Sequence, residues 1–358
     1  MGLFKILAIN PGSTSTKIAV FENEELVFGK SIRHEHSQLS VFSKVAFQFE
    51  FRRDLIVKEL FDQSISLSNL AAIVGRGGLL KPISSGVYEV NEKMINDLLQ
   101  GHQGEHASNL GGLIAADIAK NIKGCKAYIA DPVVVDELQP VARITGHPAF
   151  QRISIFHALN QKAVAKKYAI SVNKSYQKLN LIIVHLGGGI SVGAHCMGKV
   201  IDVNNALDGE GPFSPERSGT LPAGALAKMC FNGSFSLELI QKMIVGEGGL
   251  VAHLGTNQFL TLCNWVKEGR LDAKLIFDAM AYNVAKSIGA MAVTLKGAVD
   301  AIILTGGMAH NELFVSIIRE QVSFLAQVVV YPGEDEMAAL AMNGLAILRG
   351  EEISKTYL

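Results

Sequence analysis

The chain has 358 residues, of which 49% are hydrophobic and 18% are charged. This length is too great for one ordinary hydrophobic core, so we expect two domains in a compact, core-rich protein. Lysine plus arginine and aspartate plus glutamate each number 33. The overall charge therefore favours neither nucleic acid nor an anionic membrane as a partner, and any anion site must be local.

The four cysteines are widely spaced and include no CxxC pair. This spacing argues against a disulfide framework and a cysteine zinc site, and it favours the reducing cytoplasm. No segment approaches the ~18 consecutive apolar residues that span a membrane, and the N-terminus has no export cleavage pattern. We therefore expect a cytoplasmic protein without a membrane anchor.

The first predicted element is a β-hairpin, in which strands at residues 6–9 and 18–21 flank a turn at 10–13. The turn region offers backbone amides, clustered hydroxyls and Lys17, a set that suits a polyphosphate, although a solvated hairpin tip has the same composition. Gly12 and Lys17 do not have P-loop spacing and no helix follows, which excludes a P-loop.

Further elements of the first half are predicted as strands at 26–32, 70–74 and 127–130, and helices at 51–61, 92–100 and 109–122. Arg76 follows the second of these strands among glycines that permit a close approach, whereas a solvated arginine is the alternative. Asp131 directly follows the last of these strands. Catalytic carboxylates are often found at this end of a strand in α/β sheets, but an aspartate here can also simply begin a turn. His102 and His106 could form a metal pair, but neighbouring glycines favour a solvated loop.

The second half begins with a predicted helix at 158–169, a strand at 181–186, a glycine turn at 187–189 and a strand at 190–194. This arrangement repeats the first hairpin about half a chain length later. Aligning the two patterns places Gly12 on Gly188 and Ser15 on Ser191. A repeat of this length predicts two lobes of the same fold.

The remaining elements are helices at 223–231, 237–244, 258–266, 272–296 and 337–348, a helix starting at 312, and strands at 299–304 and 328–331. Gly306 and Gly307 follow the strand at 299–304. Glycines at a strand end suit a turn that lets a nucleotide's base and ribose pass the backbone, although a simple strand-to-helix turn is the alternative.

Three glycine turns in this order resemble the superfamily of actin, sugar kinases and heat-shock-type ATPases, and within it the acetokinase family over nearly the whole chain. The resemblance implies an α/β fold of two duplicated actin-like (ribonuclease H-like) lobes with an interdomain nucleotide cleft. We predict an N-terminal lobe from residues 1–150 plus about 338–358, and a C-terminal lobe from 151–337 that carries the adenosine-binding turn. The resemblance also implies that the protein binds ATP/ADP and forms a homodimer or higher homo-oligomer.

The resemblance assigns the residues that match family motifs to two tasks. Residues implied to bind ATP lie in the two hairpins and the adenosine turn: Asn10, Ser13, Ser15, Lys17, His185, Gly187, Gly188, Gly189, Gly306 and Gly307. Residues implied to act in catalysis are charged or imidazole side chains: Arg76, Asp131, His157, Arg217 and Glu336. Asn10 and Glu336 are implied to serve Mg²⁺, partly through water, with Glu334 as the alternative to Glu336.

A carboxylate acceptor explains this residue set. Such an acid has a pKa near that of Glu, about 4.3, so it is ionised at neutral pH and needs no general base. The obstacle is repulsion between anions, which arginines, a histidine and Mg²⁺ offset. We therefore expect reversible in-line transfer of the ATP γ-phosphoryl group to a short-chain fatty acid, giving an acyl phosphate and ADP.

Two departures from acetate kinases indicate a longer acid, with butyrate favoured. The loop around Arg76 lacks their Val-Val-His insertion, and Ala158-Leu159 stands in place of Gly-Thr. A kinase for branched-chain carboxylates, propionate or acetate remains an alternative, as does a sugar kinase, which requires a general base. An ATP-gated binding protein, chaperone or filament subunit of the same superfamily is the non-enzyme alternative, and it would form no acyl phosphate.

Overall fold

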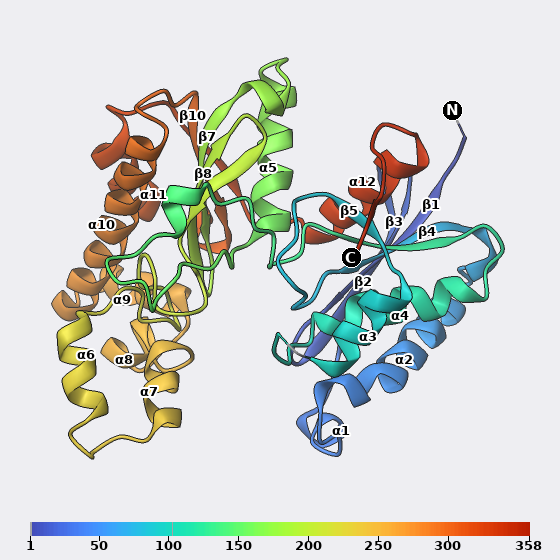
Figure 1. Ribbon diagram of the computed structural model, residues 1–358, viewed down its shortest axis with the longest axis horizontal. Helices are drawn as coiled ribbons and strands as arrows, with labels where there is room; N and C mark the ends of the chain where they lie inside the picture. The colour runs from blue at the N-terminus through green and yellow to red at the C-terminus, as the bar shows by residue number, and fades with distance from the viewer. Residues whose placement is uncertain (1, 102) are drawn as a thin grey trace. The chain divides into compact units, whose positions relative to one another are not determined.

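The computed structural model describes residues 2–101 and 103–358, so His102 and the metal pair considered for it lie outside the described residues. The chain forms two compact units. One extends to Val135 and also includes Asp335–Leu358, and the other is Asp136–Glu334. In Figure 1 the first unit combines the blue and cyan N-terminal elements with the red helix α12 (Glu336–Leu348).

The first unit contains a seven-stranded sheet in the order β12-β5-β6-β4-β1-β2-β3. Its strands are β1 (Lys5–Pro11), β2 (Ser15–Glu22), β3 (Glu25–Arg33), β4 (Leu70–Arg76), β5 (Val87–Glu89), β6 (Lys126–Ala130) and β12 (Lys355–Thr356). Its helices, besides α12, are α1 (His36–Leu39), α2 (Phe49–Asp62), α3 (Glu92–Gln100), α4 (Asn109–Lys120) and 3₁₀ turns at Val45–Gln48 and Leu67–Asn69. β1 pairs antiparallel with β2 and parallel with β4, which confirms the predicted hairpin.

Helices cover both faces of this sheet. Leu7 and Ile9 of β1 point into a core that includes side chains of α2, α3 and α4. α12 packs on β1 and β4, where a Cβ on Gly344 would lie only 2.6 Å from the Val74 side chain. Since β1, β4 and β6 are parallel to one another, their carboxyl ends share one edge of the sheet.

The second unit contains a five-stranded sheet in the order β11-β10-β7-β8-β9. Its strands are β7 (Asn180–Leu186), β8 (Ile190–Cys196), β9 (Lys199–Val203), β10 (Ala301–Gly306) and β11 (Val328–Pro332). Its helices are α5 (Ala158–Ser171), α6 (Ala223–Cys230), α7 (Leu237–Ile244), α8 (Gly249–Leu254), α9 (Phe259–Lys267), α10 (Leu271–Thr294), α11 (Glu312–Val322) and 3₁₀ turns at Pro140–Arg143, Tyr176–Lys178 and Gly307–His310. β7 pairs antiparallel with β8 and parallel with β10, as β1 does with β2 and β4. This repetition confirms the duplicated α/β fold.

The two faces of the second sheet pack against different helices. Ile182 and Val184 belong to a core shared with α10 and α11, whereas Leu181 and Ile183 pack with α5. Residues 136–150, which the sequence analysis assigns to the first domain, lie in this unit. One of their links to it is the hydrogen bond from the Gln139 amide to the Ile201 carbonyl, 3.0 Å long. No helix in the described part of the chain is long and apolar enough to cross a membrane.

Candidate active site

In the first unit, the hairpin turn between β1 and β2 is held from behind by Arg52 of α2. This side chain is 1% exposed. It donates to the carbonyls of Gly12, Ser13 and Ser15 at 2.7, 3.2 and 3.2 Å. The sequence analysis missed Arg52, because an arginine in a charged helical stretch has the pattern of a solvated face. The bonds direct the turn's carbonyl oxygens toward α2, while Ser13 and Lys17 are exposed.

Asn10, Arg76 and Glu336 form one contact group at the carboxyl ends of β1 and β4. The Asn10 amide donates to Glu336 Oε2 at 2.5 Å, and Arg76 Nη1 lies 3.2 Å from Glu336 Oε2 and 3.3 Å from Asn10 Oδ1. Gly75, next to Arg76, lets the backbone of α4 approach the strand closely, since a Cβ on Gly75 would overlap the Gly111 carbonyl. The close approach of strand and helix therefore fixes where Arg76 emerges.

Asp131 follows β6 at the same edge of the sheet and is 3% exposed. Its Oδ1 accepts hydrogen bonds from Ser85 Oγ at 2.6 Å and from the Gly86 amide at 2.8 Å. Its backbone has a φ of 37°, in a region that non-glycine residues rarely adopt. The loop before β5 thus holds this carboxylate in one orientation.

In the second unit, two histidines stack at the first turn of α5. The rings of His157 and His185 are 3.8 Å apart with an interplanar angle of 9°. His185 Nδ1 bonds Asn160 Oδ1 at 2.9 Å, and its Nε2 lies 3.0 Å from Glu334 Oε1. The two glutamates considered for Mg²⁺ therefore have different partners: Glu334 contacts a histidine of the second unit, and Glu336 contacts the group in the first.

Arg217 lies against the glycine turn between β7 and β8. Its Nη1 donates to the Ala206 carbonyl at 2.5 Å. A Cβ on Gly189 would lie 2.6 Å from Arg217 Cζ, so only glycine leaves room for the guanidinium. Burial lowers the pKa of Arg217, while the charge of Glu216 opposes this effect. A poorly solvated cation of this kind attracts an anion more strongly than an exposed one does.

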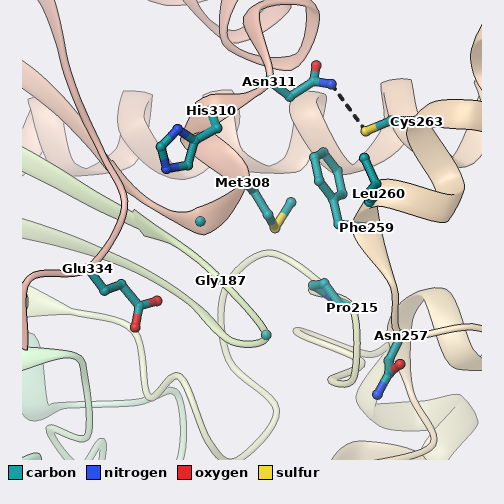
Figure 2. Close-up of a pocket in the computed structure, with 12 residues that line it drawn as sticks. Gly187, Pro215, Asn257, Phe259, Leu260, Cys263, Met308, His310, Asn311 and Glu334 are labelled. Carbon is teal, nitrogen blue, oxygen red and sulfur yellow. Dashed lines mark hydrogen bonds between the residues drawn. The ribbon is translucent and has the colours of Figure 1, made fainter. Parts of the chain in front are cut away.

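A pocket of about 430 Å³ opens in the same unit, a volume that suits a small-molecule ligand. It is lined by Gly187, Gly188, Pro215, Asn257, Phe259, Leu260, Cys263, Gly307, Met308, His310, Asn311 and Glu334. Figure 2 shows apolar side chains toward one end and the Glu334 carboxylate toward the other.

The two glycines of the predicted adenosine turn have different surroundings. Gly307 is exposed and lines the pocket. Gly306 is buried, has a φ of 91° and exchanges backbone hydrogen bonds with Gly333. A Cβ on Gly306 would lie 2.7 Å from the Leu186 carbonyl carbon. Its contacts therefore support packing between strands.

The described residues contain no group of three or more His, Cys, Asp and Glu side chains that could hold a metal ion. Some of the sequence-predicted residues are in contact with one another within each unit. Asn10, Arg76 and Glu336 are in mutual contact in the first, and His157 and His185 stack in the second. Also in the second unit, Arg217 lies against Gly189 of the glycine turn.

Solved structures share the α/β fold of the duplicated lobes. The crystal structure of Porphyromonas gingivalis acetate kinase superimposes with a TM-score of 0.79 at 19% identity, covering 96% of this chain and 100% of that one. A sequence model of the acetokinase family matches residues 151–341. "Butyrate kinase 2" of Clostridium acetobutylicum is 56% identical over 354 residues, and a "Probable butyrate kinase" of Phocaeicola vulgatus is 57% identical over 353, each match covering 99% of both chains. The chain belongs to the acetokinase family.

Proposed function

We propose that this protein transfers the γ-phosphoryl group of ATP to a short-chain fatty acid, with butyrate as the preferred acceptor. The reaction is reversible and yields an acyl phosphate and ADP. Full-length identity of 56% and 57% to proteins named as butyrate kinases supports the class of acceptor. The structural observation that carries the proposal is the stacked His157–His185 pair, because His185 also contacts Glu334 on the wall of the pocket.

The chemistry requires stabilisation of charge more than proton transfer. An oxygen of the acid forms the new bond to the γ-phosphorus, and the bond to the β,γ-bridging oxygen breaks with its electron pair leaving on ADP. No proton moves, since the acid is already ionised. We assign His157 and Arg217 to the equatorial phosphoryl oxygens, and Arg76 to the acyl carboxylate, because positioned cations lower the cost of bringing anions together. Asp131 orients an arginine or Mg²⁺.

The nucleotide is proposed to use two kinds of surface. In the first unit, the hairpin residues proposed to bind the ATP phosphates are Asn10, Ser13, Ser15 and Lys17. In the second unit the turn at 187–189 and Gly307 meet the nucleotide, and the apolar side chains of the pocket provide a surface for its base. Gly306 contributes by shaping the backbone beside Gly307.

Mg²⁺ is part of the proposal, and the donor set of the first unit fits it. Mg²⁺ prefers oxygen ligands and is usually held by one or two carboxylates, substrate phosphates and water. Glu336 offers a carboxylate and Asn10 an amide oxygen, and the two side chains are held together by the bond from the Asn10 amide nitrogen to Glu336 Oε2. These two residues would hold the ion, partly through water. When bound, Mg²⁺ supplies positive charge that offsets the charge of the phosphates.

The acceptor is tested by trapping acyl phosphate as a hydroxamate with ATP and Mg²⁺ across acetate, propionate, butyrate, isobutyrate and valerate. We expect the highest kcat/KM for butyrate. A higher value for isobutyrate would assign the protein to branched-chain acids. The homo-oligomeric state and the cytoplasmic location belong to the same proposal, and analytical ultracentrifugation tests the first, with a monomer as the contradicting result.

A further inference from the structure

The face of β8 that α5 covers is polar and yet fully buried. Ser191 and His195 are both 0% exposed, and Gly193 is buried between them. The alternate residues belong to the hydrophobic core on the other side of the sheet: Ile190, Val192 and Ala194. Buried polar groups cost free energy unless they are hydrogen-bonded, so each polar atom on this face should have a partner.

The partners form a chain of hydrogen bonds that ends at His157. Tyr176 Oη lies 2.7 Å from His195 Nδ1, and His195 Nε2 lies 2.9 Å from Gln161 Oε1. Gln161 Nε2 lies 2.8 Å from Ser191 Oγ and 3.2 Å from the Ser191 carbonyl. Ser191 Oγ in turn lies 2.9 Å from His157 Nδ1. Gln161 is itself 0% exposed, so water does not compete for these bonds.

The sequence of α5 and the register of the hairpin bring these groups together. His157 and Gln161 are four residues apart, which places them on one side of the helix start. Ser191 pairs directly with His185 across the strands, so both side chains lie on the face toward α5. Gly193 provides the space, because a Cβ there would lie 2.6 Å from Gln161 Oε1.

The direction of each bond follows from which atoms can donate. A carbonyl oxygen only accepts, so the Gln161 nitrogen must face Ser191 and its oxygen must face His195. His195 therefore donates from Nε2. Burial lowers the pKa of His195 well below its usual value, with the charge of Lys162 as the second cause, so the ring is neutral. Its Nδ1 then accepts from the Tyr176 hydroxyl.

The bond between Ser191 and His157 also has one consistent direction. The Ser191 hydroxyl already accepts from Gln161, and the only acceptor for its own hydrogen among the residues described is His157 Nδ1. His157 therefore accepts at Nδ1 and carries its hydrogen on Nε2. The stacking of its ring on His185 restricts rotation out of this arrangement.

We propose that Gln161 and Ser191 are positioning residues that hold His157 as the Nε2–H tautomer and orient that hydrogen toward a phosphoryl oxygen. This inference rests on the proposed function insofar as it gives His157 a phosphoryl oxygen to contact. Gln161 and Ser191 act through His157 rather than on the substrate, and they determine which ring nitrogen of His157 can donate.

The test combines ¹⁵N NMR of histidine-labelled protein with kinetics. A His157→Asn spectrum identifies the His157 signals. We expect the wild-type protein to show a protonated Nε2 and an unprotonated Nδ1. Ser191→Ala removes the donor to Nδ1, so we expect a mixed tautomer signal and a kcat that is about tenfold to hundredfold lower, with KM values for ATP and butyrate within threefold.

Ser171→Ala is the matched control. Ser171 is exposed at the far end of α5, where its hydroxyl bonds the Tyr168 carbonyl, and we expect wild-type kcat and an unchanged His157 spectrum. If Ser191→Ala does not fold, Gly193→Ala is the second variant. Its Cβ would press on Gln161 Oε1, so it should disturb the Gln161–His195 bond and, through Gln161, the His157 tautomer.

Two results would overturn the inference: a wild-type His157 protonated on Nδ1, or a folded Ser191→Ala protein with an unchanged spectrum and kcat. A wild-type protein that forms no acyl phosphate but shows the Nε2–H tautomer would instead refute the proposed function. The wild-type spectrum alone decides the tautomer, so the two failures are distinguishable.

Discussion

Gly189→Ala should disable the enzyme by displacing one guanidinium. The new Cβ would lie 2.6 Å from Arg217 Cζ and closer still to Nη1, whereas ordinary contacts begin near 3.4 Å. The guanidinium must therefore move by about 1 Å, which also breaks its bond to the Ala206 carbonyl. Because a misplacement of about 1 Å in a catalytic group can cost ~10²-fold in rate, we expect kcat to fall about a hundredfold.

The assay is steady-state formation of butyryl hydroxamate, with circular dichroism and thermal unfolding to check the fold. Gly289→Ala in α10 is the control, because nothing lies within 4 Å of its Cβ position. It should keep wild-type kcat and gain up to about 1 kcal/mol of stability from better helix propensity. A folded Gly189→Ala protein with kcat within threefold of wild type would refute the role given to Arg217.

Three further predictions concern the first unit and the two glutamates. Arg52→Lys loses the fork that binds the hairpin carbonyls, so urea denaturation should show a loss of about 2–4 kcal/mol, and unchanged stability would contradict the clamp. Burial, and secondarily the charge of Arg52, lowers the pKa of His34 from 6.5 to about 4. The unfolded chain therefore binds a proton in this range that the folded protein does not, so stability is full above pH 6.5 and falls by about 3 kcal/mol toward pH 4. His34→Gln should flatten this part of the curve, and equal acid sensitivity would exclude His34 as its source. Glu336→Gln should raise the Mg²⁺ concentration for half-maximal activity at least tenfold and Glu334→Gln much less, whereas the reverse order would assign the ion to Glu334.

Much of the fold is predictable because its elements carry local signals. The helix predicted at 92–100 matches α3 at both ends, since Asn91 caps its first turn and Gly101 ends it in the left-handed conformation. β12 was not predicted, because Lys355–Thr356 is too short for any periodicity, and its pairing with β5 is a long-range contact.

The candidate site was only partly predictable, because burial of a polar residue depends on which element covers it. The alternation of Ser191, Gly193 and His195 with apolar residues is the pattern of a half-solvated strand, yet α5 buries this face. Arg52 has the same ambiguity in α2. A sequence shows which residues share a face, but not what that face packs against.

The central claim, direct phosphoryl transfer to a short-chain acid, is tested most directly by ³¹P NMR of the protein with ATP, Mg²⁺ and butyrate. The account predicts an acyl phosphate signal that grows in equal amount with ADP and disappears when butyrate is omitted. ADP accompanied only by inorganic phosphate from the first minutes, with no acyl phosphate at any butyrate concentration, would contradict it.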